Sequence, residues 1–125
     1  MLIVVDDDDG IRVLLGELLA DRGYDVITAQ NGAEGLDRIR REPRLSLLIT
    51  DIRMAGIDGW ELARRAQAMR ADLKVLYITG YPGEHYPDDA APGPLLRKPW
   101  RAGEFYRCVE LLLGSDGAGS PDFPA

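Results

Sequence analysis

The chain has 125 residues, the usual length of a single domain, and its 46% hydrophobic and 29% charged residues are typical of globular proteins. A net charge of −6 at pH 7 argues against a surface built for nucleic-acid phosphates. The single cysteine excludes an internal disulfide, and no apolar run is long enough for a transmembrane helix. These features predict one domain in a reducing, cytoplasmic compartment.

Five short apolar runs along the chain are typical of buried strands. In chain order they cover residues 2–5, 25–29, 45–50, 74–78 and 95–97. Helical spacing of apolar residues separates them, most clearly over 11–19, and a last amphipathic helix follows over 105–113. The alternation predicts an α/β fold, in which a five-stranded parallel sheet carries helices on both faces.

Capping signals mark the starts of the first three predicted helices. Asp8 or Asp9 can cap the first helix, and we favour Asp9. Asn31 and Asp58 each stand three residues before a glutamate, which resembles a capping box. In the last helix Cys108 lies on the apolar stripe, so we interpret it as a small core residue.

The connection over residues 80–94 breaks this alternation. Five of the eight prolines of the chain fall between residues 82 and 99. Pro82, Pro87 and Pro92 leave no proline-free stretch longer than four residues between them. Because proline inside a helix costs ~3 kcal/mol, we expect a loop here with at most one helical turn.

Polar side chains end four of the predicted strands. Asp6 and Asp7 follow the first strand, Asp51 the third, Thr79 the fourth and Lys98 the fifth. Parallel strands bring these ends to one edge of the sheet, where α/β proteins bind their ligands. Three carboxylates at that edge repel one another unless cations are near. Lys98 supplies one positive charge, and the oxygen ligands suit Mg²⁺, so the sequence predicts a Mg²⁺ site in which one carboxylate can act as a nucleophile.

Four short motifs stand at these strand ends in order along the chain. They are Val-Val-Asp-Asp at 4–7, Thr-Asp-Ile-Arg-Met at 50–54 with Asp-Gly at 58–59, Ile-Thr-Gly at 78–80, and Lys-Pro-Trp at 98–100. Together they resemble the receiver domains of two-component response regulators, of the kind that is similar to chemotaxis regulators. The likeness runs over nearly the whole chain, from residue 2 to about residue 114.

The resemblance implies a flavodoxin-like, doubly wound sheet of strand order 2-1-3-4-5. The Thr-Gly-Tyr step at 79–81 is similar to a subset of receivers in which the fourth helix is irregular, so we expect this helix to be short or missing. We expect the receiver domain to cover residues 1–113. Residues 114–125 are rich in Gly, Ser and Pro and are predicted to be a disordered tail.

The resemblance also implies how phosphorylation takes place. Asp51 is the expected phosphoacceptor. Lys98 pairs with its carboxylate before the reaction and with the phosphoryl group after it, and Thr79 gives its hydroxyl to a phosphoryl oxygen. This is phosphoryl transfer by positioning and charge neutralisation. The Lys98–Pro99 peptide is expected to be cis.

A metal site follows from the same resemblance. Mg²⁺ is expected to be held by Asp7, by Asp51 and by the backbone carbonyl of Arg53, with Asp6 acting mainly through water. The chain departs from the family at Leu95, where an aromatic residue that swings inward on activation is usual. We therefore expect the 80–94 connection, not an aromatic side chain, to transmit the signal.

The implied function is that of a stand-alone phosphoacceptor receiver in a phosphorelay. Its phosphoryl group would come from a phosphohistidine on a histidine kinase or a histidine phosphotransfer protein. It would then signal by binding a downstream protein, as a monomer or weak dimer, with no nucleic acid or membrane as partner. It is not expected to be a conventional enzyme, because it catalyses only its own phosphorylation and slow dephosphorylation.

Two other functions are compatible with such a fold. A flavodoxin-like nucleotide or flavin binder needs a glycine-rich phosphate loop after the first strand, where this chain has four aspartates at 6–9. A Mg²⁺-dependent phosphatase with an aspartyl nucleophile uses an Asp-x-Asp pair, whereas Asp51 is followed by Ile52 and Arg53. Steady release of phosphate would indicate the phosphatase, and a stable phosphoryl adduct the receiver.

Overall fold

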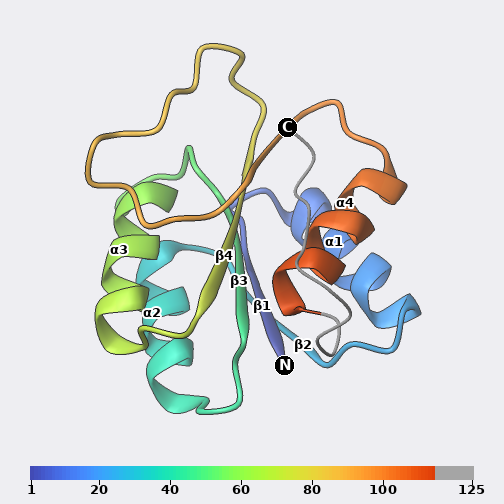
Figure 1. Cartoon of the computed structure of the whole chain (residues 1–125), viewed down its shortest axis with the longest axis horizontal. Coiled ribbons are helices and arrows are strands. Elements are labelled where there is room, and N and C mark those ends of the chain that lie inside the picture. The colour runs from blue at the N-terminus through green and yellow to red at the C-terminus, as the bar shows by residue number, and fades with distance from the viewer. Residues whose placement is uncertain (115–125) are drawn as a thin grey trace.

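The computed structural model describes residues 1–114 (Figure 1). Its elements are β1 (Leu2–Val5), α1 (Asp9–Asp21), β2 (Val26–Ala29), α2 (Gly32–Arg41), β3 (Leu47–Asp51), α3 (Gly59–Met69), β4 (Lys74–Thr79), β5 (Leu95–Arg97) and α4 (Ala102–Leu113). None of the described helices is long and apolar enough to cross a membrane. The predicted disordered tail lies, apart from Gly114, outside the described residues.

All five strands run parallel in one sheet of order β2-β1-β3-β4-β5. Helices α2 and α3 cover one face of this sheet, and α1 and α4 cover the other (Figure 1). The predicted fold class and strand order are therefore confirmed. Because the strands are parallel, all of their carboxyl ends lie at the same edge of the sheet.

The core is divided into two layers by the sheet, because successive strand residues point to opposite faces. In β1, Ile3 and Val5 pack with buried residues of α2 and α3, whereas Leu2 and Val4 pack with those of α1 and α4. Burial on both faces explains why the strands are continuous apolar runs. Cys108 of α4 is buried in the second layer, as the sequence predicts.

Side-chain caps fix where the helices begin. The carboxylate of Asp8, and not that of Asp9, accepts the bond from a first-turn amide of α1, at 3.0 Å. The prediction that Asp9 is the cap is therefore wrong: it is the first helical residue, and its carboxylate pairs with Arg12. The predicted caps of α2 and α3 are confirmed, since Asn31 and Asp58 each accept from the backbone N–H three residues later.

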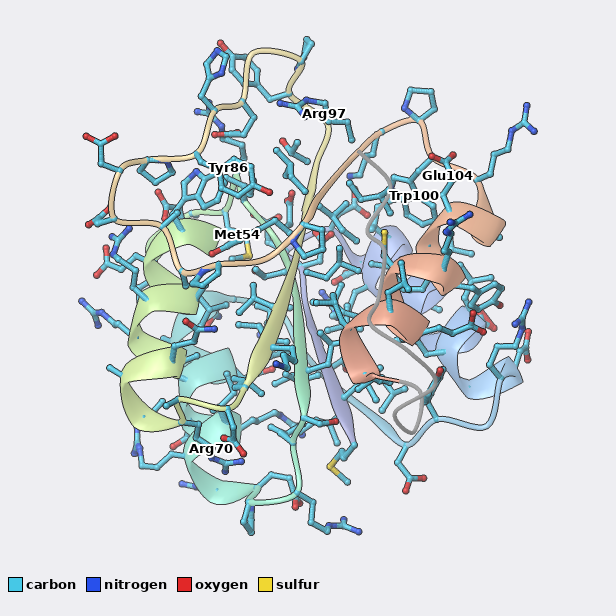
Figure 2. The ribbon with its side chains drawn as sticks, viewed as in Figure 1. Met54, Arg70, Tyr86, Arg97, Trp100 and Glu104 are labelled. Atoms are coloured by element: carbon cyan, nitrogen blue, oxygen red, sulfur yellow. The ribbon has the colours of Figure 1, made fainter. Side chains whose placement is uncertain are left out.

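The 80–94 segment contains no helix, as its prolines predict. It rises beyond the carboxyl ends of the strands, descends beside the start of α3 and crosses in front of β4 (Figure 1). Side chains hold it there. The hydroxyl of Tyr77 in β4 donates to Ala91 O at 2.7 Å, and the ring of Tyr86 lies 5.2 Å from that of Trp60 in α3. Figure 2 shows Tyr86 near the start of α3. The segment is thus packed against the domain without regular structure.

Gly93 brings the backbone of this segment close to the sheet. A Cβ atom at this position would lie 2.2 Å from Val75 O in β4, so the backbone would have to move. We expect Gly93→Ala to lower the free energy of unfolding by about 1–3 kcal/mol, as overpacking usually does. Urea unfolding measures this loss. Gly103→Ala is the control, because a Cβ there meets nothing within 4 Å. Equal stability of the two variants would contradict the close approach.

Candidate functional site

The predicted site residues come together because the sheet is parallel. Asp6 directly follows β1, Asp51 ends β3, Thr79 ends β4, and Lys98 directly follows β5. The strands β1, β3, β4 and β5 are neighbours in that order, so the four residues stand side by side at the carboxyl edge of the sheet. This is the position at which open α/β sheets bind ligands.

Three carboxylates form the centre of this edge. Asp6, Asp7 and Asp51 each place an oxygen within 4.8 Å of the other two. Asp6 is buried: its Oδ1 accepts from the N–H of Asp8 at 2.9 Å, and its Oδ2 has no partner among the described residues. Asp51 is half-buried, and its Oδ1 accepts from Ile52 N at 2.9 Å. Asp7 is exposed, so the cluster opens to solvent on its side.

Burial and neighbouring negative charge raise the proton affinity of Asp6 and Asp51. Burial, followed by the negative charge of Asp6, raises the pKa of Asp51 from 3.8 to about 6. Burial also raises the pKa of Asp6. The positive charge of Lys98 opposes both shifts without cancelling them. The negative charge of the site thus exceeds the positive charge that Lys98 supplies. A buried oxygen without a partner, such as Asp6 Oδ2, is a place where a cation or an ordered water fits.

Thr79 and Lys98 are positioned by their backbones. The N–H of Lys98 donates to Thr79 O at 2.8 Å, which joins the ends of β4 and β5. Thr79 is buried, and its Oγ1 accepts from the N–H of Tyr81 at 3.1 Å. The Lys98–Pro99 peptide is cis, as the resemblance implies.

Arg53, whose carbonyl is expected to face the metal, directs its side chain to the 80–94 segment. Its Nε pairs with Glu84 Oε1 at 2.9 Å, and its guanidinium lies 4.3 Å from the centre of the Tyr81 ring. Glu84 is buried and also accepts from Trp60 Nε1 at 3.3 Å. Sequence reasoning missed Glu84, because a glutamate in a Pro- and Gly-rich stretch looks like a solvated loop residue.

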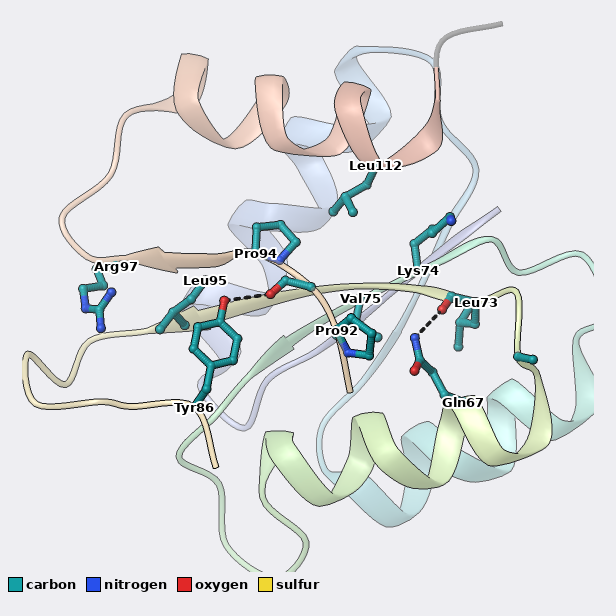
Figure 3. A pocket seen from close by; sticks show the side chains of 12 residues that line it. Gln67, Leu73, Lys74, Val75, Tyr86, Pro92, Pro94, Leu95, Arg97 and Leu112 are labelled. Atoms are coloured by element: carbon teal, nitrogen blue, oxygen red, sulfur yellow. Dashed lines mark hydrogen bonds between the residues drawn. The ribbon is translucent and has the colours of Figure 1, made fainter. Parts of the chain in front are cut away.

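A separate cavity of about 800 Å³ lies away from the acidic cluster (Figure 3). It is bounded by Gln67 of α3, by the start of β4, by Pro92–Pro94 and by Leu112 of α4. None of the predicted site residues lines it. The candidate site is therefore an open cluster at the strand ends rather than a pocket.

The chain matches the response regulator receiver domain family over residues 2–92. It is 38% identical over 115 residues to the response regulator receiver protein CpdR of Brucella abortus, covering 90% of this chain and 95% of that protein. Several other curated relatives are longer, and the chain spans less than two thirds of their length. The chain therefore belongs to the receiver domain family of two-component signalling.

Solved receiver structures resemble this one in fold. The response regulator TrrA of Thermotoga maritima, solved in complex with Mg²⁺-BeF, has a TM-score of 0.79 and 35% identity, with 89% of this chain and 96% of that chain covered. The receiver domain of the hybrid histidine kinase CckA has a TM-score of 0.77 and 30% identity, with 90% and 97% covered. Receiver domains are signalling domains rather than conventional enzymes, and the family binds Mg²⁺.

The raised pKa of Asp51 predicts how stability depends on pH in the metal-free protein. The folded state holds this proton up to about pH 6, whereas the unfolded chain releases it near 3.8. Between these values the folded state binds more protons, so its stability falls as the pH rises. Urea unfolding at pH 4 and pH 7 should show a smaller fall for Asp51→Asn than for the wild type.

The matched control is Asp72→Asn, which removes an exposed carboxylate next to β4, at the opposite end of that strand. It should keep the pH dependence of the wild type. A fall of equal size in all three proteins would contradict the raised pKa of Asp51.

Proposed function

We propose that this chain is the phosphoacceptor of a phosphorelay, and that Asp51 takes a phosphoryl group from a phosphohistidine. The proposal is carried by the three carboxylates gathered within 4.8 Å at the sheet edge. Such a cluster costs stability, and groups with strongly perturbed pKa values gather at functional sites. The neighbouring strand ends supply Thr79 and Lys98, a hydroxyl and an ammonium that suit a phosphoryl group.

The cluster fits a hard divalent cation. We assign Asp7, Asp51 and the carbonyl of Arg53 as its protein ligands, with Asp6 acting mainly through water. The buried Oδ2 of Asp6 that has no partner within the described part of the chain supports this assignment, as does the raised pKa of Asp51. When bound, Mg²⁺ neutralises charge on the carboxylates and on the transferred phosphoryl group.

The residues of the chain then carry out the transfer by positioning. A carboxylate oxygen of Asp51 attacks phosphorus, and the phosphorus–nitrogen bond of the phosphohistidine breaks. The nitrogen leaves with the electron pair as the imidazole takes up a proton. Lys98 pairs first with the carboxylate and then with the phosphoryl group. The hydroxyl of Thr79, which accepts from a backbone N–H, can at the same time donate to a phosphoryl oxygen.

A histidine kinase or histidine phosphotransfer protein is the proposed donor, and a downstream protein the proposed target. The likeness to the receiver of a hybrid histidine kinase supports a donor of this class. The net charge of −6 supports protein partners rather than nucleic acid. We propose that the chain acts in the cytoplasm, as a monomer or weak dimer.

Intact mass spectrometry tests the phosphoacceptor directly. Wild-type protein incubated with Mg²⁺ and a small phosphodonor such as acetyl phosphate should gain one phosphoryl group. Asp51→Asn should gain none, because it lacks the nucleophile. Asp7→Asn should lose both the adduct and Mg²⁺ binding measured by calorimetry, because it lacks a metal ligand.

The control for these variants is Asp9→Asn, which removes one carboxylate from the same aspartate run but outside the cluster. It should be phosphorylated as the wild type is. An adduct that persists in Asp51→Asn would refute the assignment, and steady release of phosphate without an adduct would indicate a phosphatase.

Lys98→Arg should not preserve the reaction. The compact ammonium of lysine can pair with both Asp51 and the phosphoryl group. The guanidinium of arginine is larger and favours a planar, bidentate contact. We expect a lower initial rate of phosphorylation and a lower final level of adduct. Lys74→Arg, at the amino end of β4, is the control and should behave as the wild type does. Normal phosphorylation of Lys98→Arg would show that only charge is needed there.

A further inference from the structure

Glu84 is a buried acid that the proposed chemistry does not use. Its side chain is only 7% exposed, although it belongs to the irregular 80–94 segment. One carboxylate oxygen pairs with Arg53 Nε at 2.9 Å, and the other accepts from Trp60 Nε1 at 3.3 Å. Trp60 is the second residue of α3, so the carboxylate joins the 80–94 segment to the start of that helix.

The backbone of Glu84 makes two further contacts. Its carbonyl accepts from Arg97 Nη2 at 2.7 Å, and its N–H donates to Tyr81 O at 3.2 Å. Arg97 ends β5 and directly precedes Lys98. Glu84 therefore contacts the chain just after β3, just after β4 and at the end of β5, which are the three strands that carry Asp51, Thr79 and Lys98.

The contact with Arg53 also places Tyr81. The guanidinium that pairs with Glu84 lies 4.3 Å from the centre of the Tyr81 ring, a distance at which a cation and an aromatic face attract. Arg53 stands two residues beyond Asp51, and Tyr81 stands two residues beyond Thr79. The two stacked side chains thus project from the same edge of the sheet as the acidic cluster.

Burial of the carboxylate makes this arrangement rigid. An ion pair between two exposed groups contributes little, but removing the partner of a buried charge is strongly unfavourable. Arg53 is 62% exposed in its side chain and would be free to move, were it not held by the buried Glu84. The position of the exposed pair is therefore determined by an acid that lies beneath it.

We propose that Glu84 is a positioning residue of the phosphorylation site: it holds Arg53 against Tyr81, and this pair limits the access of water to a phosphoryl group on Asp51. The inference rests on the proposed phosphorylation. In the step concerned, a water oxygen attacks phosphorus, and the bond from phosphorus to the Asp51 oxygen breaks. The carboxylate leaves with the electron pair, and inorganic phosphate and one proton are released.

The test compares the decay of the adduct in matched variants. Each protein is phosphorylated with acetyl phosphate and Mg²⁺, freed of the donor, and followed by intact mass. Glu84→Gln should lose its phosphoryl group about fivefold faster than the wild type, the factor that roughly 1 kcal/mol produces. Asp89→Asn should decay as the wild type does. It removes the same charge from the same segment, but breaks an exposed pair with Arg64 of α3.

A second comparison tests whether Glu84 and Arg53 act through one contact. Arg53→Ala removes the exposed partner of the ion pair, and it should speed decay as much as Glu84→Gln does. The double variant should decay no faster than either single variant, because both remove the same contact.

Three results would overturn the inference. They are an unchanged decay rate in Glu84→Gln, an equal acceleration in Asp89→Asn, or effects of Arg53→Ala and Glu84→Gln that multiply in the double variant. A wild-type protein that takes up no phosphoryl group at all would instead refute the proposed function on which the inference rests.

Discussion

Repulsion between carboxylates at one edge of the sheet is the constraint on which the site depends. Asp6, Asp7 and Asp51 are brought within 4.8 Å of one another by strands whose positions are determined elsewhere, in the two apolar layers. The fold thus holds charges together that would separate in a free chain. This repulsion favours positive charge beside the cluster, which Lys98 supplies and which a metal ion would supply in the proposed function.

The parallel sheet converts distant positions in the sequence into neighbours. Asp6 and Lys98 are far apart along the chain, yet both directly follow strands of one sheet. Strands buried on both faces cannot shift their pairing by one residue without exposing apolar side chains or burying the polar ones at their ends. The packing of the core therefore also determines the geometry of the site, and no separate scaffold is needed for it.

Sequence reasoning succeeded where local patterns decide the structure. Buried strands give apolar runs and parallel pairing aligns their ends, so the neighbourhood of Asp51 was predictable. Sequence reasoning was less reliable in choosing the N-cap of α1, since Asp8 and Asp9 are adjacent aspartates and both are good caps. It could not find Glu84, whose partners Arg53 and Trp60 lie 31 and 24 residues away. Burial of Glu84 depends on how the irregular 80–94 segment folds back on the domain, and no periodic pattern in the sequence predicts this.

The short strand β5 lies at the edge of the sheet, so the part of the site that contains Lys98 is held by fewer contacts than the part that contains the carboxylates. β5 pairs with only three residues of β4 and has no neighbouring strand on its other side within residues 1–114, whereas β1 and β3 lie inside the sheet. Segments held by few contacts open at a lower free-energy cost than the core does. Lys98 therefore follows a strand at the edge of the sheet, whereas the three carboxylates follow or end strands inside it. Detachment of this edge alone would leave the acidic cluster assembled without Lys98, and it would not require global unfolding.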